Sequence, residues 1–172
     1  VELQLYKIDL GEAADYINKS LCDIVVSFST EFLEGENIKY KILREGKYLA
    51  IVGKGHPLFD NTSISIKDLY SYPLIMLSKE VIGNMYDKML ERAVSEGYEP
   101  IIEKTVDNIE TEMFSIITEG FIGFCPESQS LAEYGDDIRL IEIEDSPHRY
   151  IVAAGYSKLN TNRTLKEFLK YI

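Results

Sequence analysis

The sequence feature that most constrains the fold of this chain is a pair of short apolar runs, each followed by a serine. The strand predicted over residues 23–26 begins with Asp23, and its apolar run 24–26 leads into Ser27; residues 74–77 form the other run and lead into Ser78. Short apolar runs bounded by polar residues are typical of buried strands. Ligands of open α/β sheets bind beyond the carboxyl ends of such strands, where the loops diverge. The pattern therefore predicts an α/β sheet with a small-molecule site.

Helical periodicity separates the predicted strands. Residues 82–97 carry apolar side chains at helical spacing up to Gly97, which suits a helix end. Ser65 is a candidate N-cap, and Asp107-x-x-Glu110 resembles a capping box. Alternating strands and helices predict a mostly parallel sheet. Further strands are expected over 1–6, 38–43, 47–52, 101–106, 121–125, 138–143 and 150–154, with Glu45-Gly46 as a turn, and further helices over 11–21, 65–69, 107–119, 128–134 and 164–171.

The charge balance argues against nucleic acid as a direct partner. The 172 residues include 29 acidic and 18 basic side chains, which gives a net charge of −11. A surface of this sign repels phosphate backbones, and the chain contains no basic helix or zinc-finger spacing. We therefore expect this chain by itself not to bind DNA.

The sequence also indicates a compartment. No apolar run approaches the roughly 20 residues that a membrane span needs. The first residues lack the basic and apolar regions of a secretory leader. Cys22 and Cys125 both lie in apolar surroundings, as expected for reduced, buried thiols. A cytoplasmic protein without a membrane partner is the expectation.

No pattern points to catalysis, a metal or a cofactor. His56 lies beside a proline in a turn, and His148 has no second ligand at metal-binding spacing. Neither histidine belongs to a recognisable motif with a serine or cysteine nucleophile. The sequence has no phosphate-binding loop, and no carboxylate spacing singles out an acid–base pair. We expect no enzymatic activity, no metal and no cofactor.

Seven short sequence motifs occur along the chain, each once. They are Leu21-Cys22-Asp23-Ile24-Val25-Val26, His56-Pro57-Leu58, Ser65-x-x-Asp68-Leu69, Tyr72-Pro73-Leu74-Ile75, Gly97-Tyr98-x-Pro100, the stretch 120–127 and the helix 164–169. Together they make the chain similar to the effector-binding (substrate-binding) domain of LysR-type transcriptional regulators. Two features depart from that family. The strand and helix that usually precede the position of Val1 are not in this sequence, and Gly120-Phe121-Ile122-Gly123 keeps one glycine of a Gly-x-Gly pair.

The resemblance implies a two-lobed α/β fold of the periplasmic-binding-protein-like type 2 class, with mixed sheets flanked by helices. Two crossover strands join the lobes, and an effector lies in the cleft between them. Lobe I is expected to comprise residues 1–57 and 146–172, without the usual first strand–helix unit. Lobe II is expected to comprise residues 58–145.

The resemblance places three effector-binding residues in lobe I. Ser27 ends the strand 23–26, where the family's pocket often takes a hydroxyl group. Ser29 and Thr30 follow on the same loop. The alternative for these residues is a local role, in which their hydroxyls stabilise the turn after the strand.

The resemblance places four more effector-binding residues in lobe II. Ser78 precedes a helix whose N-terminus suits an anionic group, and Lys79 beside it could neutralise a carboxylate. Asn108 follows the strand 101–106, and Phe124 could form an apolar floor. The alternatives are a helix cap for Ser78 and Asn108, a solvated side chain for Lys79 and a core position for Phe124.

The resemblance implies a ligand-sensing regulatory domain of a bacterial transcription regulator. Its effector is a small molecule, with a carboxylate as the candidate group. A homo-oligomer is expected, and the expected oligomeric state is a dimer. DNA is contacted only through an upstream helix-turn-helix outside this chain.

Two other classes of protein share this fold. A solute-binding protein of a transport system is one, and the missing leader and the His56-Pro57-Leu58 landmark argue against it. An enzyme such as a prephenate dehydratase-like domain is the other, and its Thr-Arg-Phe motif does not occur here. The upstream coding sequence would distinguish the three classes by a helix-turn-helix, a signal peptide or neither.

Overall fold

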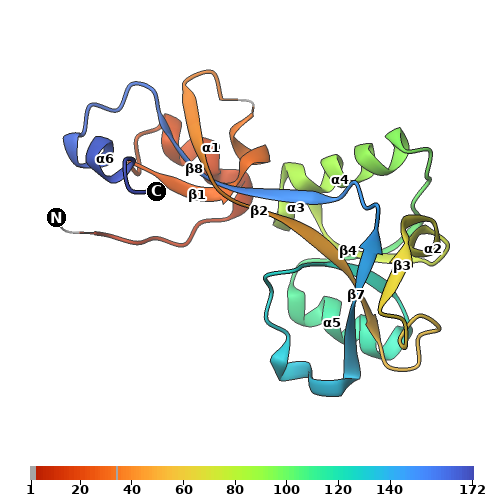
Figure 1. The fold of residues 1–172 in the computed structure, drawn as a ribbon. Helices are drawn as coiled ribbons and strands as arrows, with labels where there is room; N and C mark the ends of the chain where they lie inside the picture. Colours follow the sequence, from red (N-terminus) through yellow and green to blue (C-terminus); the bar gives the residue numbers. More distant parts are fainter. Residues whose placement is uncertain (1–2, 34) are drawn as a thin grey trace. The chain divides into compact units, whose positions relative to one another are not determined.

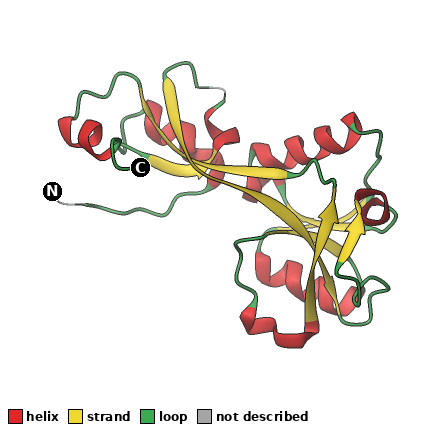
Figure 2. Cartoon of the chain, in the orientation of Figure 1, coloured by secondary structure: helices red, strands yellow, loops and turns green. Residues whose placement is uncertain are grey.

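The chain folds into helices packed on mixed β-sheets (Figure 2). The computed structural model describes residues 3–33 and 35–172. Strand pairs of both directions occur in similar number. The mixed α/β class implied by the resemblance is therefore confirmed, and the mostly parallel sheet expected from the alternation of elements is wrong. The antiparallel pairs are formed by two long strands, β2 (Ile38–Gly53) and β8 (Arg149–Ser157).

Two compact units divide the chain (Figure 1). The chain passes between them within β2 (Ile38–Gly53) and β8 (Arg149–Ser157), and again around Ile82–Met85. The lobe boundaries expected after residues 57 and 145 stay a prediction. Unit 1 comprises Val1–Glu45, Ile82–Met85 and Ile151–Ile172, and unit 2 comprises Gly46–Val81 and Tyr86–Tyr150.

Unit 1 is built on β1 (Val25–Phe28), which pairs antiparallel with β8. Helix α1 (Ala13–Asn18) packs on this pair through Ile17, which is almost fully buried. Gly155 on β8 lies opposite β1, and a Cβ at this position would overlap the ring of Phe32. The sequence therefore needs glycine here for close packing. The remaining elements of unit 1 are η1 (Leu10–Glu12), η2 (Ser29–Phe32) and α6 (Arg163–Phe168).

Unit 2 contains a sheet in which β2 pairs with β6 and β7, and β4 pairs with β5 and β6. The pairs of β2 are antiparallel and those of β4 are parallel, and β3 adds a parallel pair with β7. The strands are β3 (Ser63–Ser65), β4 (Leu74–Leu77), β5 (Ile102–Val106), β6 (Ile122–Pro126) and β7 (Ile138–Glu144). The helices are α2 (Ile66–Tyr70), α5 (Ile109–Glu119) and η3 (Ala132–Asp137), together with most of α3 (Lys79–Ile82) and α4 (Asn84–Ser95), which are shared with unit 1 at Ile82–Met85.

Apolar clusters cover both faces of the unit 2 sheet. Successive side chains of a strand point to opposite faces, so Val52 joins one cluster and Ile51 the other. The first cluster includes Leu69 of α2 and Ala93 of α4, and the second includes Ile116 of α5. All five side chains are almost completely buried, so these helices are held by the sheet.

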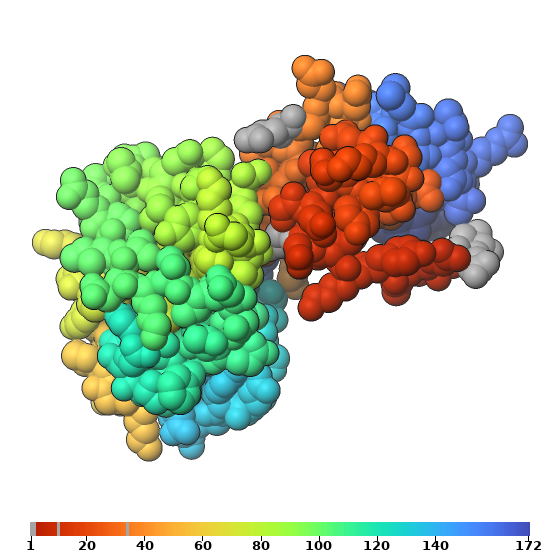
Figure 3. Space-filling view, turned by 180° about the vertical axis from the view of Figure 1, so that it is seen from behind, coloured from red at the N-terminus to blue at the C-terminus, as the bar shows by residue number. Residues whose placement is uncertain are grey.

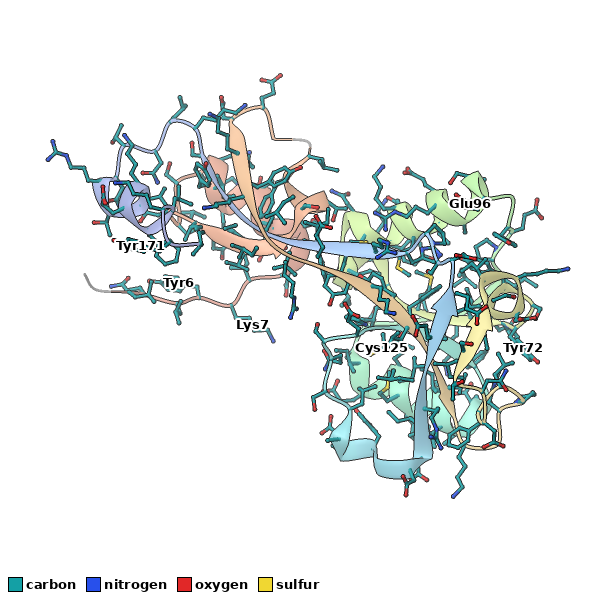
Figure 4. The ribbon with its side chains drawn as sticks, in the orientation of Figure 1. Tyr6, Lys7, Tyr72, Glu96, Cys125 and Tyr171 are labelled. Carbon is teal, nitrogen blue, oxygen red and sulfur yellow. The ribbon has the colours of Figure 1, made fainter. Side chains whose placement is uncertain are left out.

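The strand expected over residues 1–6 is wrong for the part that the structure describes. Residues 3–9 have no regular structure, and residues 1–2 lie outside the described range. Leu5 and Tyr6 are 84% and 70% exposed, and this segment lies on the surface (Figures 3 and 4). A lone strand is not stable in water without a paired neighbour, and among the described residues β1 pairs with β8 alone.

The two strands expected over 38–43 and 47–52 form the single strand β2, so the turn at Glu45-Gly46 is also wrong. A Cβ at position 46 would overlap the ring of Tyr150 on β8. Glycine therefore serves the packing of a continuous strand against β8 and does not reverse the chain.

Helix boundaries also differ from the sequence pattern. The helix expected over 82–97 is interrupted at Gly83, whose φ of +57° separates α3 from α4. The helix expected over 128–134 is a 3-10 helix at Ala132–Asp137. The N-cap at Ser65 is confirmed, and it belongs to a capping box with Asp68. No helix in the described ranges is long and apolar enough to cross a membrane.

Candidate functional site

The end of β1 leads straight into η2, and the polar side chains here are buried. Ser27, Ser29, Thr30 and Glu31 are 8%, 9%, 6% and 5% exposed, and we name them the β1–η2 polar cluster. Buried hydroxyls and carboxylates need hydrogen-bond partners, because they leave water on folding. The Oγ of Ser27 has no such partner among the described residues. The three hydroxyl residues that the resemblance assigned to lobe I thus lie together and are sheltered from solvent.

Glu31 is the member of this cluster that sequence reasoning missed. Its Oε1 accepts a hydrogen bond from the Asn84 backbone N–H at 3.2 Å and from the Thr30 hydroxyl at 3.3 Å. A Cβ at Gly83 would lie 2.8 Å from Oε2, so glycine permits the close approach. Asn84 opens α4, and the positive end of the helix dipole stabilises negative charge there. The available signal was an acidic residue directly after three hydroxyl residues at a strand end.

In unit 2, Ser78 lies where β4 ends beside β5. Its Oγ donates to Oδ1 of Asp107 at 2.7 Å, and its backbone N–H donates to the Val106 carbonyl at 2.8 Å. The two strands are parallel neighbours, so their carboxyl ends meet at one edge of the sheet. Asp107 is not among the effector-binding residues that the resemblance implied. We name Ser78, Lys79, Asp107 and Asn108 the β4–β5 edge.

Lys79 and Asn108 are engaged in local interactions at this edge. The ammonium of Lys79 forms an ion pair with Asp87 at 2.5 Å, and both side chains are about half exposed. The Oδ1 of Asn108 accepts the Thr111 backbone N–H at 2.8 Å, so Asn108 caps α5 in place of the expected Asp107. Asn108 thus has the cap role that was its alternative, and a ligand role for either residue stays a prediction.

Phe124 belongs to an aromatic group within unit 2. Its ring centroid lies 5.0 Å from that of His148 and 6.4 Å from that of Tyr48, both edge-on. His148 is completely buried, and its Nε2 is hydrogen-bonded to the Tyr70 hydroxyl. Burial, with a smaller effect of the Arg92 charge, lowers the pKa of His148 to about 4. His148 is therefore neutral at pH 7, and Phe124 packs against this neutral ring. A role of Phe124 in effector binding stays a prediction.

The two cysteines differ in their surroundings. Both are free thiols; Cys125, labelled in Figure 4, is buried in unit 2, whereas Cys22 is only half-buried, so the expected burial of Cys22 is wrong. Cys22 lies in the connection between α1 and β1, outside both elements, and this connection does not enclose its side chain fully. Burial, with a smaller effect of Glu112, raises the pKa of Cys125 to about 12. A thiol that keeps its proton at pH 7 is a poor nucleophile.

Unit 1 also contains a cavity of about 620 Å³, and no residue of the β1–η2 polar cluster lines it. Half-buried and exposed amides and hydroxyls dominate its lining, which is typical of a solvated depression. No group of three or more potential metal-ligating side chains occurs within residues 3–33 and 35–172. The cavity is lined by Ile17, Asn18, Ser20, Cys22, Gly35, Glu36, Asn37, Ser157, Leu159, Asn160 and Thr161.

The sequence matches the family model of the LysR substrate binding domain over residues 1–172. The chain belongs to this family. Solved LysR structures share its fold, and the effector-binding domain of QuiR in complex with shikimate aligns with a TM-score of 0.77 and 18% identity, over 95% of this chain and 76% of that one.

Two longer LysR regulators align equally well. HinK from Pseudomonas aeruginosa gives a TM-score of 0.77 at 16% identity, over 96% of this chain and 57% of HinK. Full-length CbnR complexed with its target DNA gives 0.75 at 16% identity, over 96% of this chain and 55% of CbnR. The LysR domain thus spans little more than half of these two regulators. Comparison with curated protein sequences gave no match.

Proposed function

We propose that this LysR substrate-binding domain senses a small polar effector through the β1–η2 polar cluster of unit 1 and the β4–β5 edge of unit 2. The observation that carries the proposal is the buried Oγ of Ser27, which lacks a partner in the described structure. A bound molecule would supply that partner. The effector acts as a switch by binding two arrangements of the domain with different affinity, and no reaction is involved.

The proposal extends to the partners of the whole regulator. The structure of CbnR holds target DNA. By analogy, DNA contact in this regulator belongs to a helix-turn-helix outside the present chain, in a cytoplasmic homodimer. A carboxylate on the effector is a further part of the proposal, and Lys79, now paired with Asp87, is its candidate cation.

Calorimetric titration of Ser27→Ala and Ser78→Ala tests this proposal. Shikimate and a panel of small polar metabolites, first screened by thermal shift, serve as probes. Each variant should lose about 0.5–1.5 kcal/mol of binding free energy, because one hydrogen bond to the probe is removed. Ser95→Ala, on the exposed end of α4, is the matched control and should bind as the wild type does. Undiminished binding by both variants would refute the assignment, and a large fall in melting temperature would favour a structural role for the serines.

A further inference from the structure

The cavity of unit 1 has a mostly neutral, hydrogen-bonding lining. Its volume of about 620 Å³ lies within the roughly 300–1,000 Å³ that is typical of small-molecule sites. Among the described residues that line it, Glu36 is the charged one, and none is a lysine, an arginine, a histidine or an aromatic residue. Six lining residues end in a carboxamide or a hydroxyl group, namely Asn18, Ser20, Asn37, Ser157, Asn160 and Thr161.

Hydrogen bonds hold two segments of the cavity wall together. The backbone N–H of Lys158 donates to the Asn37 carbonyl at 2.8 Å, and the Lys158 ammonium donates to the Glu36 carbonyl at 2.6 Å. The side-chain amides of Asn18 and Asn37 make no hydrogen bond to another residue of the described ranges. The wall is therefore fixed by backbone groups and by Lys158, while these two amides are open to a ligand. A preformed site of this kind loses little conformational entropy on binding.

Ser20 occupies a position that favours glycine. Helix α1 ends in a Schellman motif, in which the Leu21 N–H donates to the Tyr16 carbonyl at 2.9 Å and the Ser20 N–H donates to the Ile17 carbonyl at 3.1 Å. The φ of Ser20 is +54°, in the left-handed region where a side chain is strained. Ser20 lines the cavity, and within the described part of the chain its hydroxyl has no hydrogen-bond partner. A strained serine with an open hydroxyl indicates a role beyond the fold.

We infer that this cavity binds a neutral polyhydroxylated molecule, a sugar or polyol, through the amides of Asn18 and Asn37 and the hydroxyl of Ser20. Carboxamides and hydroxyls both donate and accept hydrogen bonds, and so do the hydroxyl groups of a sugar, which can replace the water in this depression. A carboxylate or phosphate would meet Glu36 and no cation, and an aromatic ring would find no ring to stack on. This site goes beyond the proposed function, which uses other residues.

Calorimetric titration of the whole chain with charge-matched sugars tests the inference. D-glucose, D-ribose and myo-inositol are the neutral probes, and D-glucuronate and D-glucosamine place a charge on the pyranose ring of glucose. Each probe is titrated at up to tens of millimolar against wild type, Asn37→Ala and Ser20→Gly. Asn61→Ala is the matched control, because Asn61 is exposed in unit 2.

The thiol of Cys22 reports where a probe binds. Cys22 lines the cavity and is half-buried, whereas Cys125 is buried elsewhere, in unit 2. Burial raises the pKa of Cys22, so alkylation with iodoacetamide is run at mildly alkaline pH and followed by peptide mass spectrometry. A molecule in the cavity should slow this alkylation.

The wild type should bind at least one neutral probe more tightly than either charged sugar, and that probe should slow alkylation of Cys22. Asn37→Ala and Ser20→Gly should each weaken binding about two- to tenfold, as expected for the loss of one hydrogen bond, and Asn61→Ala should leave it unchanged. Ser20→Gly should also melt at a higher temperature than the wild type, because glycine relieves the left-handed strain.

Four results would overturn the inference. They are the absence of binding by every neutral probe, tighter binding of a charged sugar, alkylation of Cys22 that a bound probe does not slow, and binding that neither Asn37→Ala nor Ser20→Gly weakens. Binding that Ser27→Ala weakens would assign the probe to the β1–η2 polar cluster, which overturns the inference and supports the proposed function. A lower melting temperature of Ser20→Gly would make that serine structural and overturn its ligand role. If a variant fails to fold, the wild-type ranking and alkylation decide.

Discussion

At the scale of single residues, the absence of a side chain at Gly46 allows β2 to pack against Tyr150 of β8. A side chain here would overlap the Tyr150 ring, which itself packs edge-on against Tyr48. Gly46→Ala should therefore lower the free energy of unfolding by about 1–3 kcal/mol, as overpacking does elsewhere. Urea unfolding of this variant beside Gly11→Ala provides the measurement, since a Cβ at Gly11 meets no atom within 4 Å. Equal stability of the two variants would contradict the packing role.

Glu112 makes stability depend on pH. Burial raises its pKa from 4.5 to about 8. Between these values the folded chain keeps the proton and the unfolded chain loses it, so stability falls as pH rises through this window. Each tenfold difference in proton affinity between the folded and unfolded chain corresponds to about 1.4 kcal/mol of this loss. Glu112→Gln should match the wild type near pH 5 and exceed it at pH 8 in urea unfolding, and a pH-independent difference would argue against a neutral Glu112.

At the scale of elements, the start of α5 separates a structural from a binding role. The Asn108 side chain satisfies the Thr111 N–H, one of the free donors of the first turn. Asn108→Ala should cost about 1 kcal/mol of stability, whereas Asn108→Asp keeps the acceptor and should cost little. Thermal melts, with hydrogen exchange of the first turn of α5, measure both variants. If Asn108→Ala melts like the wild type, the cap contributes no measurable stability, and that result would favour a ligand-binding role for Asn108.

At the scale of the whole molecule, the net negative charge of the chain opposes binding to DNA. With 29 acidic and 18 basic residues, it should show no sequence-specific DNA binding at physiological salt. Gel shifts and fluorescence anisotropy with a promoter fragment measure this, and a bovine serum albumin sample of similar acidity provides a background. A salt-sensitive, sequence-selective complex formed by this chain alone would disprove the expectation.

The sequence by itself determined the elements whose pattern is local. The apolar run 74–77 became β4 within its expected bounds, and Ser65 capped α2, because burial and capping depend on neighbouring residues. Ordered landmarks also led to the LysR family, and three hydroxyl residues of the candidate site came from a strand end. These features need no knowledge of distant contacts.

Tertiary structure decided what depends on residues far apart in the chain. Glycine at position 46 predicts a turn locally, yet packing against Tyr150 keeps β2 continuous. Residues 3–6 alternate like a strand, yet a strand requires a hydrogen-bonded neighbour. Glu31 is one of 29 acidic residues in the sequence, and the fold brings its side chain to the backbone N–H of Asn84, 53 positions away, and buries it in the candidate site. Local patterns specify which elements form, whereas burial and pairing between remote segments specify which side chains can meet a ligand.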